Sequence, residues 1–405
     1  MSGGDGRREF RALWVTEIVS TVGDQLAKVA VSVVVFQRTG SATAAALTYA
    51  LTLIPTIVAG PLLSPMADRF RHRELMVGCA WIQTGLVVVM AATALVPSDT
   101  IAVLGMGIAI TGVSTITAPF RAARDATVPE LVGAERVGRA QRLMTSVREI
   151  GQLAGLAGSA GVVAVVGPGT ALLLDAVSFA VTAIVLRTVL RLRPAFAHDA
   201  SATPGRRRDA VRELTRPGPL ALVGMALLVA PTIVPDALVV PLVQQMGAPT
   251  QMVGILLAAD CAGLVVADLV QRVLQRSWPN LDQAAIVPLL LLSLAPLGAF
   301  VLHPGLPIAV LLLFLSGAGA TYLPLVKGAL TPLLPPAVRG TGLGMVRTLV
   351  TAGQGLGALA GGAVTDGVGS ASAVVGWPAL VSLVPAGLLA WAWARARRAV
   401  PAAQG

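Results

Sequence analysis

The chain has 405 residues, of which 55% are hydrophobic and only 12% are charged, and its mean hydropathy is +0.79. This composition excludes an ordinary soluble domain and predicts a polytopic membrane protein. The formal net charge of +10 does not indicate a nucleic-acid-binding protein, because the basic residues cluster in short loops between apolar segments and almost no aromatic residues accompany them.

A membrane-spanning helix needs about twenty mostly apolar residues. The chain contains twelve such segments, at residues 11–37, 43–67, 74–96, 100–122, 142–166, 169–190, 219–244, 250–271, 284–302, 305–328, 340–364 and 371–394. Twenty-six of the 30 Lys and Arg residues lie in the termini, in the even-to-odd connections or at the adjoining helix ends, whereas the opposite connections contain only Arg38 and three residues, Lys28, Arg148 and Arg347, lie within the helices. Because basic short loops stay cytoplasmic, we predict an all-α membrane protein with twelve transmembrane helices and both termini in the cytoplasm.

The longest connection lies midway along the chain and divides the predicted helices into two sets of six. We predict an N-terminal six-helix half at 1–190, a cytoplasmic central loop at 191–218, a C-terminal six-helix half at 219–394 and a cytoplasmic tail at 395–405. Arg148 is followed ten residues later by Gly158, and Arg347 is followed by Gly357 at the same spacing, which indicates a duplication. We interpret the basic central loop as a solvated connector, and the alternative is a lipid-contacting patch.

A dense basic turn, within the sequence GPLLSPMADRFRHREL, separates the second and third predicted helices. It resembles the loop between helices 2 and 3 of the major facilitator superfamily, whose pattern is roughly G-x-x-x-D-R-x-G-R-R. Asp68, Arg69 and Arg73 fit this pattern, whereas Ser64 and Arg71 replace its two glycines. The alternative interpretation is a simple stop signal that orients two helices.

The resemblance implies a role for this turn in a conformational gate. In the family, the Asp of the pattern lies by the start of helix 11, which in this chain is near 336–340. Asp125 is a further candidate of the gate, as a partner of Arg71 or Arg73. The gate residues that we predict are Asp68, Arg69, Arg71, Arg73 and Asp125.

Other stretches resemble one branch of the same superfamily, which includes the enterobactin exporter and macrolide-efflux-like permeases. They are SxxGDxL at 20–26, RTGSATAAAL at 38–47, APFRAARDATVPELV at 118–132 and LDAVSF at 174–179. The segment QLAGLAGSAG departs from the antiporter pattern of helix 5, because it has Ser159 and no proline. The resemblance implies a transporter that exports a drug, a macrolide-like metabolite or a siderophore.

Charged residues within the predicted helices are candidates for substrate or proton coupling, since a charge at the bilayer centre costs roughly 2.5–3.5 kcal/mol. Glu17, Asp24 and Lys28 lie within about 40 degrees of one helix face, so this face is expected to point inward. Asp24 and Lys28 either neutralise each other, or Asp24 binds a proton or the substrate. The other candidates are Arg148, Glu149, Asp236, Asp260 and Arg347.

Glycines at four-residue spacing let helix backbones approach closely. We therefore predict helix-packing contacts, rather than ligand contacts, at Gly151, Gly155, Gly158, Gly353, Gly357 and Gly361. Arg148 and Arg347 lie on or near these glycine faces. Two roles stay open for these arginines: gating ion pairs with Glu17 or Glu149, and binding of an anion.

These features predict a secondary transporter of the bacterial inner membrane that exports a small hydrophobic or amphipathic compound by alternating access. No nucleotide-binding loop of the GxxxxGK[ST] kind occurs, so we expect an ion gradient, most simply of protons, to drive transport. The expected partners are the small-molecule substrate, protons and the lipid bilayer. We expect a monomer that binds no nucleic acid, cofactor or metal.

Three alternatives remain open from the sequence. An importer of the same fold is the nearest one. An integral-membrane enzyme would need nucleophile, base or metal ligands at one depth, and the only three histidines, His72, His198 and His303, lie in or beside loops. A non-transporting sensor or scaffold would be expected to carry a sizeable soluble domain or a long tail.

Overall fold

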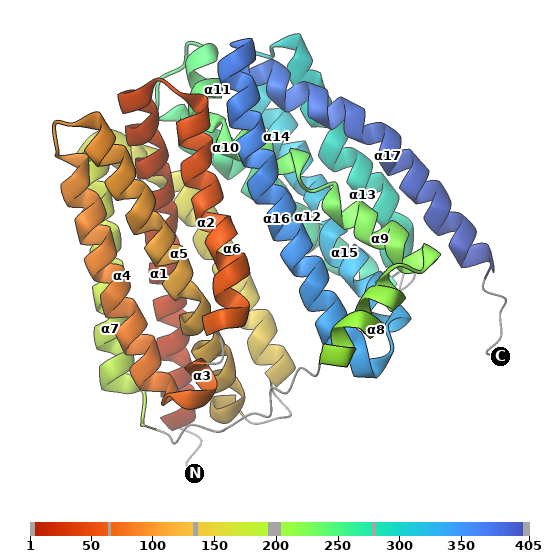
Figure 1. Cartoon of the computed structure of the whole chain (residues 1–405), viewed down its shortest axis with the longest axis horizontal. Helices are drawn as coiled ribbons and strands as arrows, with labels where there is room; N and C mark the ends of the chain where they lie inside the picture. The colour runs from red at the N-terminus through yellow and green to blue at the C-terminus, as the bar shows by residue number, and fades with distance from the viewer. Residues whose placement is uncertain (1–4, 64–65, 133–136, 193–203, 278–280, 400–405) are drawn as a thin grey trace. The chain divides into compact units, whose positions relative to one another are not determined.

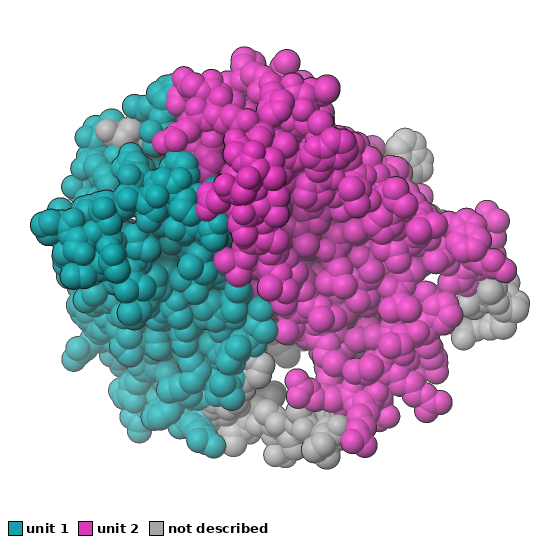
Figure 2. Space-filling view, turned by 45° about the horizontal axis from the view of Figure 1, so that its top comes forward, with its two compact units in different colours: residues 1–200, 249–258 teal, residues 201–248, 259–405 magenta. Residues whose placement is uncertain are grey.

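The computed structural model describes residues 5–63, 66–132, 137–192, 204–277 and 281–399 (Figure 1). Within these ranges the chain is helical and contains no strand. The chain divides into two compact units, residues 1–200 with 249–258 and residues 201–248 with 259–405 (Figure 2). We call them the first and second unit. The predicted division at 1–190, 191–218 and 219–394 stays a prediction.

Among the described residues of the first unit, seven helices precede its segment 249–258. They are α1 (Asp5–Thr39), α2 (Ala42–Leu63), α3 (Met66–Arg69), α4 (His72–Ala94), α5 (Asp99–Val132), α6 (Val137–Val166) and α7 (Pro168–Val189). Helix α1 packs against α6 and α7, and α4 packs against α5 and α7. The core near the α3–α4 connection is formed by Leu13, Met76, Ala123, Val128 and Leu186.

The second unit contains α8 (Pro204–Leu214), α9 (Pro217–Leu227), η2 (Pro231–Ile233), α10 (Val234–Ala237), α11 (Val239–Gln245), α13 (Leu281–Gly298), η3 (Ala299–Leu302), α14 (Leu306–Ala320), α15 (Tyr322–Leu330), η4 (Thr331–Leu333), α16 (Pro336–Val368) and α17 (Ala371–Ala399). Helix α12 (Met252–Ser277) begins in the first unit and continues into the second. Helix α13 packs against α14 and α17. A large core joins Leu222, Met225, Leu290, Tyr322 and Val346.

Ten helical stretches in the described ranges are long and apolar enough to cross a membrane. Helices α6 and α16, which correspond to the predicted segments 142–166 and 340–364, are not among these ten. In α6 a shorter apolar stretch is found, Ile150–Val163. Both helices are rich in glycine, which contributes no apolar side chain. The fold is that of a multi-pass helical membrane protein, and the count of twelve spans stays a prediction.

The segment predicted as one helix at 219–244 is divided into α9, η2, α10 and α11. Pro231 begins η2, Pro235 is the second residue of α10 and Pro241 is the third residue of α11. Each proline lacks a backbone N–H and disfavours a continuous helix. The central loop also differs from a simple connector, because α8 forms within it. Ala210 and Leu214, four residues apart on α8, are buried, and α8 packs against α16.

Two of the three predicted packing glycines of α6 lie close to α1. A Cβ on Gly155 of α6 would lie 3.0 Å from the Cα of Val22 on α1, and a Cβ on Gly151 would lie 3.3 Å from the Cβ of Thr21. In contrast, a Cβ on Gly158 would meet nothing within 4 Å. Close approach to α1 is therefore seen at the first two positions and not at Gly158, because α6 turns this residue outward.

The second unit has the same arrangement on α16. A Cβ on Gly357 would lie 2.7 Å from the carbonyl oxygen of Ala230, and a Cβ on Gly361 would lie 2.9 Å from Cγ1 of Val234. Gly353 is the looser contact, at 3.7 Å from the Cβ of Ala230. The glycine face of α16 thus lies against the broken helix formed by η2 and α10.

Candidate functional site

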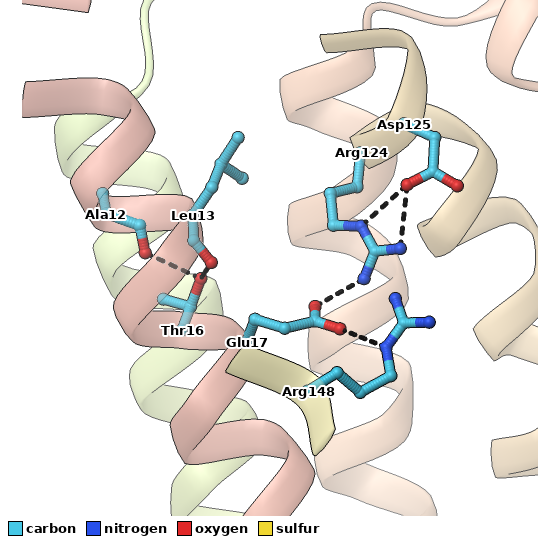
Figure 3. Close-up of polar contacts among 7 residues, drawn as sticks. All are labelled: Ala12, Leu13, Thr16, Glu17, Arg124, Asp125 and Arg148. Atoms are coloured by element: carbon cyan, nitrogen blue, oxygen red, sulfur yellow. Dashed lines mark hydrogen bonds and ion pairs between the residues drawn. The ribbon is translucent and has the colours of Figure 1, made fainter. Parts of the chain in front are cut away.

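A buried ion-pair cluster joins three helices of the first unit (Figure 3). Glu17 of α1 is only 8% exposed, and its two carboxylate oxygens accept hydrogen bonds from two arginines. Arg124 of α5 donates through Nη1 to Oε2 at 2.5 Å, and Arg148 of α6 donates through Nε to Oε1 at 2.8 Å. Hydrogen bonds between charged groups are roughly twice as strong as neutral ones, so Glu17 cross-links α1, α5 and α6.

Arg124 is the centre of this cluster, with an exposed fraction of 4%. Besides Glu17 it contacts Asp125, whose Oδ1 accepts hydrogen bonds from Nη2 at 2.8 Å and from Nε at 3.1 Å. From the sequence, Arg124 was not assigned to the site. Its pairing with Glu17 spans 107 positions of sequence, and no local pattern reveals such a contact.

Asp24 lies on the same side of α1, as its spacing from Glu17 predicted. Its charge interacts with Lys28 on α1, with Arg121 on α5 and with Arg148 on α6. Arg121 also interacts electrostatically with Glu17. The inward face of α1 therefore points at basic residues of α5 and α6, and Asp24 has more than one cationic neighbour within the unit.

Asp175 on α7 is a further acidic residue near Asp24, and sequence reasoning did not assign it a role. It is 1% exposed, and the hydroxyl of Ser178 donates a hydrogen bond to its Oδ1 at 3.1 Å. A Cβ on Gly23 would lie 2.3 Å from this oxygen, so the carboxyl group sits directly against the α1 backbone. The charges of Asp175, Asp24 and Lys28 interact. An Asp within the apolar segment LDAVSF was the only signal for this position.

The candidates of the second unit are arranged differently. Asp236 on α10 and Asp260 on α12 lie close enough for their like charges to interact. The side chain of Arg347 on α16 is exposed, and its charge interacts unfavourably with that of Lys327 on α15. The roles predicted for Asp236, Asp260 and Arg347 stay predictions.

The predicted gate residues lie in the turn between α2 and α4 and at the start of α4, except Asp125, which lies on α5. Arg69 is exposed, Arg71 Nη1 lies 3.7 Å from Glu74 Oε1, and Arg73 donates a hydrogen bond to the carbonyl oxygen of Arg187. Asp125 pairs with Arg124, rather than with Arg71 or Arg73 as the sequence suggested, because Arg124 precedes it on the same helix. The side chains of Asp68 and Glu149 lie outside the described part of the structure.

Comparison with known proteins identifies the family. A sequence profile of the Major Facilitator Superfamily matches residues 13–287. No curated protein sequence matches the chain.

Several solved structures have a similar fold. The nucleoside transporter NupG is 13% identical, with a TM-score of 0.76 over 95% of this chain and 99% of that chain. A bacterial homologue of the iron transporter ferroportin, in its inward-facing state, is 14% identical, with a TM-score of 0.74 over 94% and 98%. A D-xylose–proton symporter is 15% identical, with a TM-score of 0.69 over 95% and 97%. The chain has the fold of these transporters and belongs to the Major Facilitator Superfamily.

Proposed function

We propose that this protein is a proton-coupled exporter of a small hydrophobic or amphipathic compound, working by alternating access in the bacterial inner membrane. A transporter, rather than an enzyme, is indicated by the family and by the fold that the chain shares with transporters of several substrate classes. The resemblance of the stretches at 20–26, 38–47 and 118–132 to efflux permeases favours export.

The observation that carries proton coupling is the position of Asp24 among charged neighbours inside the first unit. A carboxylate there can bind a proton, or it can attract a cation while Lys28 and Arg121 compete for the same negative charge. Proton and substrate would then bind in turn, so that arrival of one releases the other. This exchange at a single group is sufficient to couple a proton gradient to export.

The neighbouring Glu17 cluster has a structural part in the proposed cycle. Because Glu17 holds α1, α5 and α6 together through Arg124 and Arg148, these helices are expected to move as one body during alternating access. Protonation changes at Asp24 would then act on the whole body rather than on one helix. We propose that the protein works as a monomer and that the turn at 66–73 contributes to the gate.

Substitution of Asp24 tests the proposal. Asp24→Asn mimics a permanently protonated carboxyl, so the purified variant in proteoliposomes is expected to remain folded and to lose substrate movement driven by an imposed pH gradient. The double variant Asp24→Asn with Lys28→Met is the matched control for charge balance. It is expected to remain folded and equally inactive in pH-driven transport.

The opposite pattern would exclude Asp24 as the proton carrier. If Asp24 only neutralises Lys28, the single variant loses expression through an uncompensated buried charge, and the double variant regains both expression and pH-driven transport. The proton carrier would then be sought among Glu17, Asp236 and Asp260.

A further inference from the structure

The second unit contains a cavity of about 530 Å³ between η2 with α10, the second half of α16 and the first half of α17. Its walls include Pro231, Val234, Gly361, Val364 and Trp377. Helices α16 and α17 diverge from their connecting turn (Figure 1), and the broken helix of η2 and α10 forms the floor. This volume lies within the usual range of small-molecule pockets, roughly 300–1,000 Å³.

The walls of this cavity come from η2 with α10, from α16 and from α17. At Gly357 and Gly361 the backbone of α16 lies close to Ala230 and Val234, and a Cβ at either glycine would meet these neighbours. On the opposite wall, Pro378 lies within α17. The space is therefore bounded by three apolar walls.

The chemistry of the walls restricts what can bind. Ser382, with its hydroxyl, and Trp377, with its indole N–H, supply the only polar side-chain groups among the lining residues, and none of these residues is charged. A polar ligand would lose its hydrogen bonds to water without replacing them, and burial of an unpaired polar group is unfavourable. A hydrocarbon chain loses no hydrogen bonds and gains contact with the walls.

The length and the opening of the cavity match one leaflet of a bilayer. Along α16 it extends from Gly357 to Val368, and the eleven steps between these residues, at 1.5 Å each, cover about 16 Å. That is about half of the roughly 30 Å hydrocarbon core of a membrane. The lining residues Val364, Val368, Trp377 and Val381 are half or more exposed, so the cavity opens on an apolar surface. Tryptophan is enriched at membrane–water interfaces, and Trp377 lies near the start of α17.

From these features we propose that the cavity binds one acyl chain of a membrane phospholipid, taken from the leaflet on the side of the α16–α17 turn. The chain enters between Val364 and Val381 and extends toward Gly357. This site is separate from the charged groups of the first unit, and its occupation depends on neither the direction nor the energy source of transport.

Photochemical crosslinking tests the proposal on the full-length protein. The protein is placed in nanodiscs that contain phosphatidylethanolamine with a diazirine on one acyl chain, and mass spectrometry locates the crosslinked residues after illumination. We expect crosslinks on the lining residues of α16 and α17 to exceed, several-fold, those on Ile108 of α5, which is 72% exposed and outside the cavity. Equal labelling of the cavity and Ile108 would overturn the proposal, without any variant being needed.

Variants that fill the cavity sharpen the test. Ala360→Phe and Ser382→Phe add a ring from opposite walls, and each is expected to reduce cavity crosslinks several-fold while leaving those on Ile108 unchanged. Leu356→Phe is the matched control, because Leu356 lies one turn from Ala360 on α16, is 63% exposed and does not line the cavity. Undiminished cavity labelling in the filling variants, purified as monodisperse protein, would contradict the proposal. Displacement of the crosslinks by tetraphenylphosphonium would instead assign the cavity to a transported compound and would overturn the lipid assignment.

Discussion

Replacement of Glu17 by glutamine tests whether the three-helix ion-pair cluster stabilises the first unit. Glu17 is buried between Arg124 and Arg148, and its carboxylate charge is the one that both guanidinium groups share. Glutamine keeps the size of the side chain and one hydrogen-bond acceptor. It leaves Arg124 buried, with Asp125 as its remaining charged partner among the described residues.

The structure gives the expected magnitude. Removal of one partner from a buried ion pair costs about 3–5 kcal/mol of unfolding free energy. Arg148 is 34% exposed at its side chain and can turn to water, and Arg124 retains Asp125. We therefore expect Glu17→Gln to lower the free energy of unfolding by about 3 kcal/mol, the lower end of this range. Asp125→Asn is the matched control, because the Asp125 side chain is 53% exposed and such a pair contributes about 0–1 kcal/mol.

Reversible unfolding by SDS in mixed micelles measures these free energies on the purified protein. The double variant Glu17→Leu with Arg124→Met adds a second comparison, because replacing a buried ion pair by apolar residues of similar volume is often neutral. It is expected to be more stable than Glu17→Gln. The reasoning fails if Glu17→Gln costs no more than Asp125→Asn, or if the double variant is as unstable as the single one.

Three further predictions concern packing, topology and the gate. Gly155→Ala should destabilise the protein by about 1–3 kcal/mol through overpacking against α1. Gly158→Ala should instead stabilise it by roughly 0.5–1 kcal/mol, because alanine lowers the conformational entropy of the unfolded chain. Equal SDS unfolding curves of the two variants would refute this contrast. A topology reporter fused after Arg208 should be cytoplasmic and one inserted near Ala248 external, and a cytoplasmic signal at Ala248 would overturn the twelve-helix topology. Asp68→Asn should weaken the outward-facing state, because a charge near a helix N-terminus contributes about 0.3–2 kcal/mol; an unchanged inward-to-outward ratio in accessibility labelling would count against it.

The parts of the fold that could be predicted from the sequence are those that local patterns determine. Long apolar segments mark the membrane helices. The spacing of Glu17 and Asp24 puts both on one face of α1, and their charges interact with basic residues of α5 and α6. Glycines at four-residue spacing likewise indicate the close approach of α6 to α1 at Gly151 and Gly155. These features follow from the periodicity of the α-helix, which can be recognised in a single sequence.

Contacts between distant segments could not be predicted in the same way. The pairing of Glu17 with Arg124 and the packing of Asp175 against Gly23 depend on which helices become neighbours. Asp125 was assigned to other arginines because the sequence alone cannot rank possible partners. The divisions of the segment 219–244 have a sequence signal in its prolines, but prolines also occur inside continuous helices, as Pro119 does in α5.

The central claim, that the protein exports a compound at the expense of a proton gradient, is tested most directly by accumulation in cells. A panel of hydrophobic and amphipathic compounds, cationic, neutral and anionic, is measured in cells with and without the protein, each in the presence and absence of a protonophore. We expect at least one compound to accumulate less when the protein is present, and we expect the protonophore to abolish the difference. Higher accumulation with the protein would indicate an importer, and reduced accumulation that persists with the protonophore would contradict proton coupling.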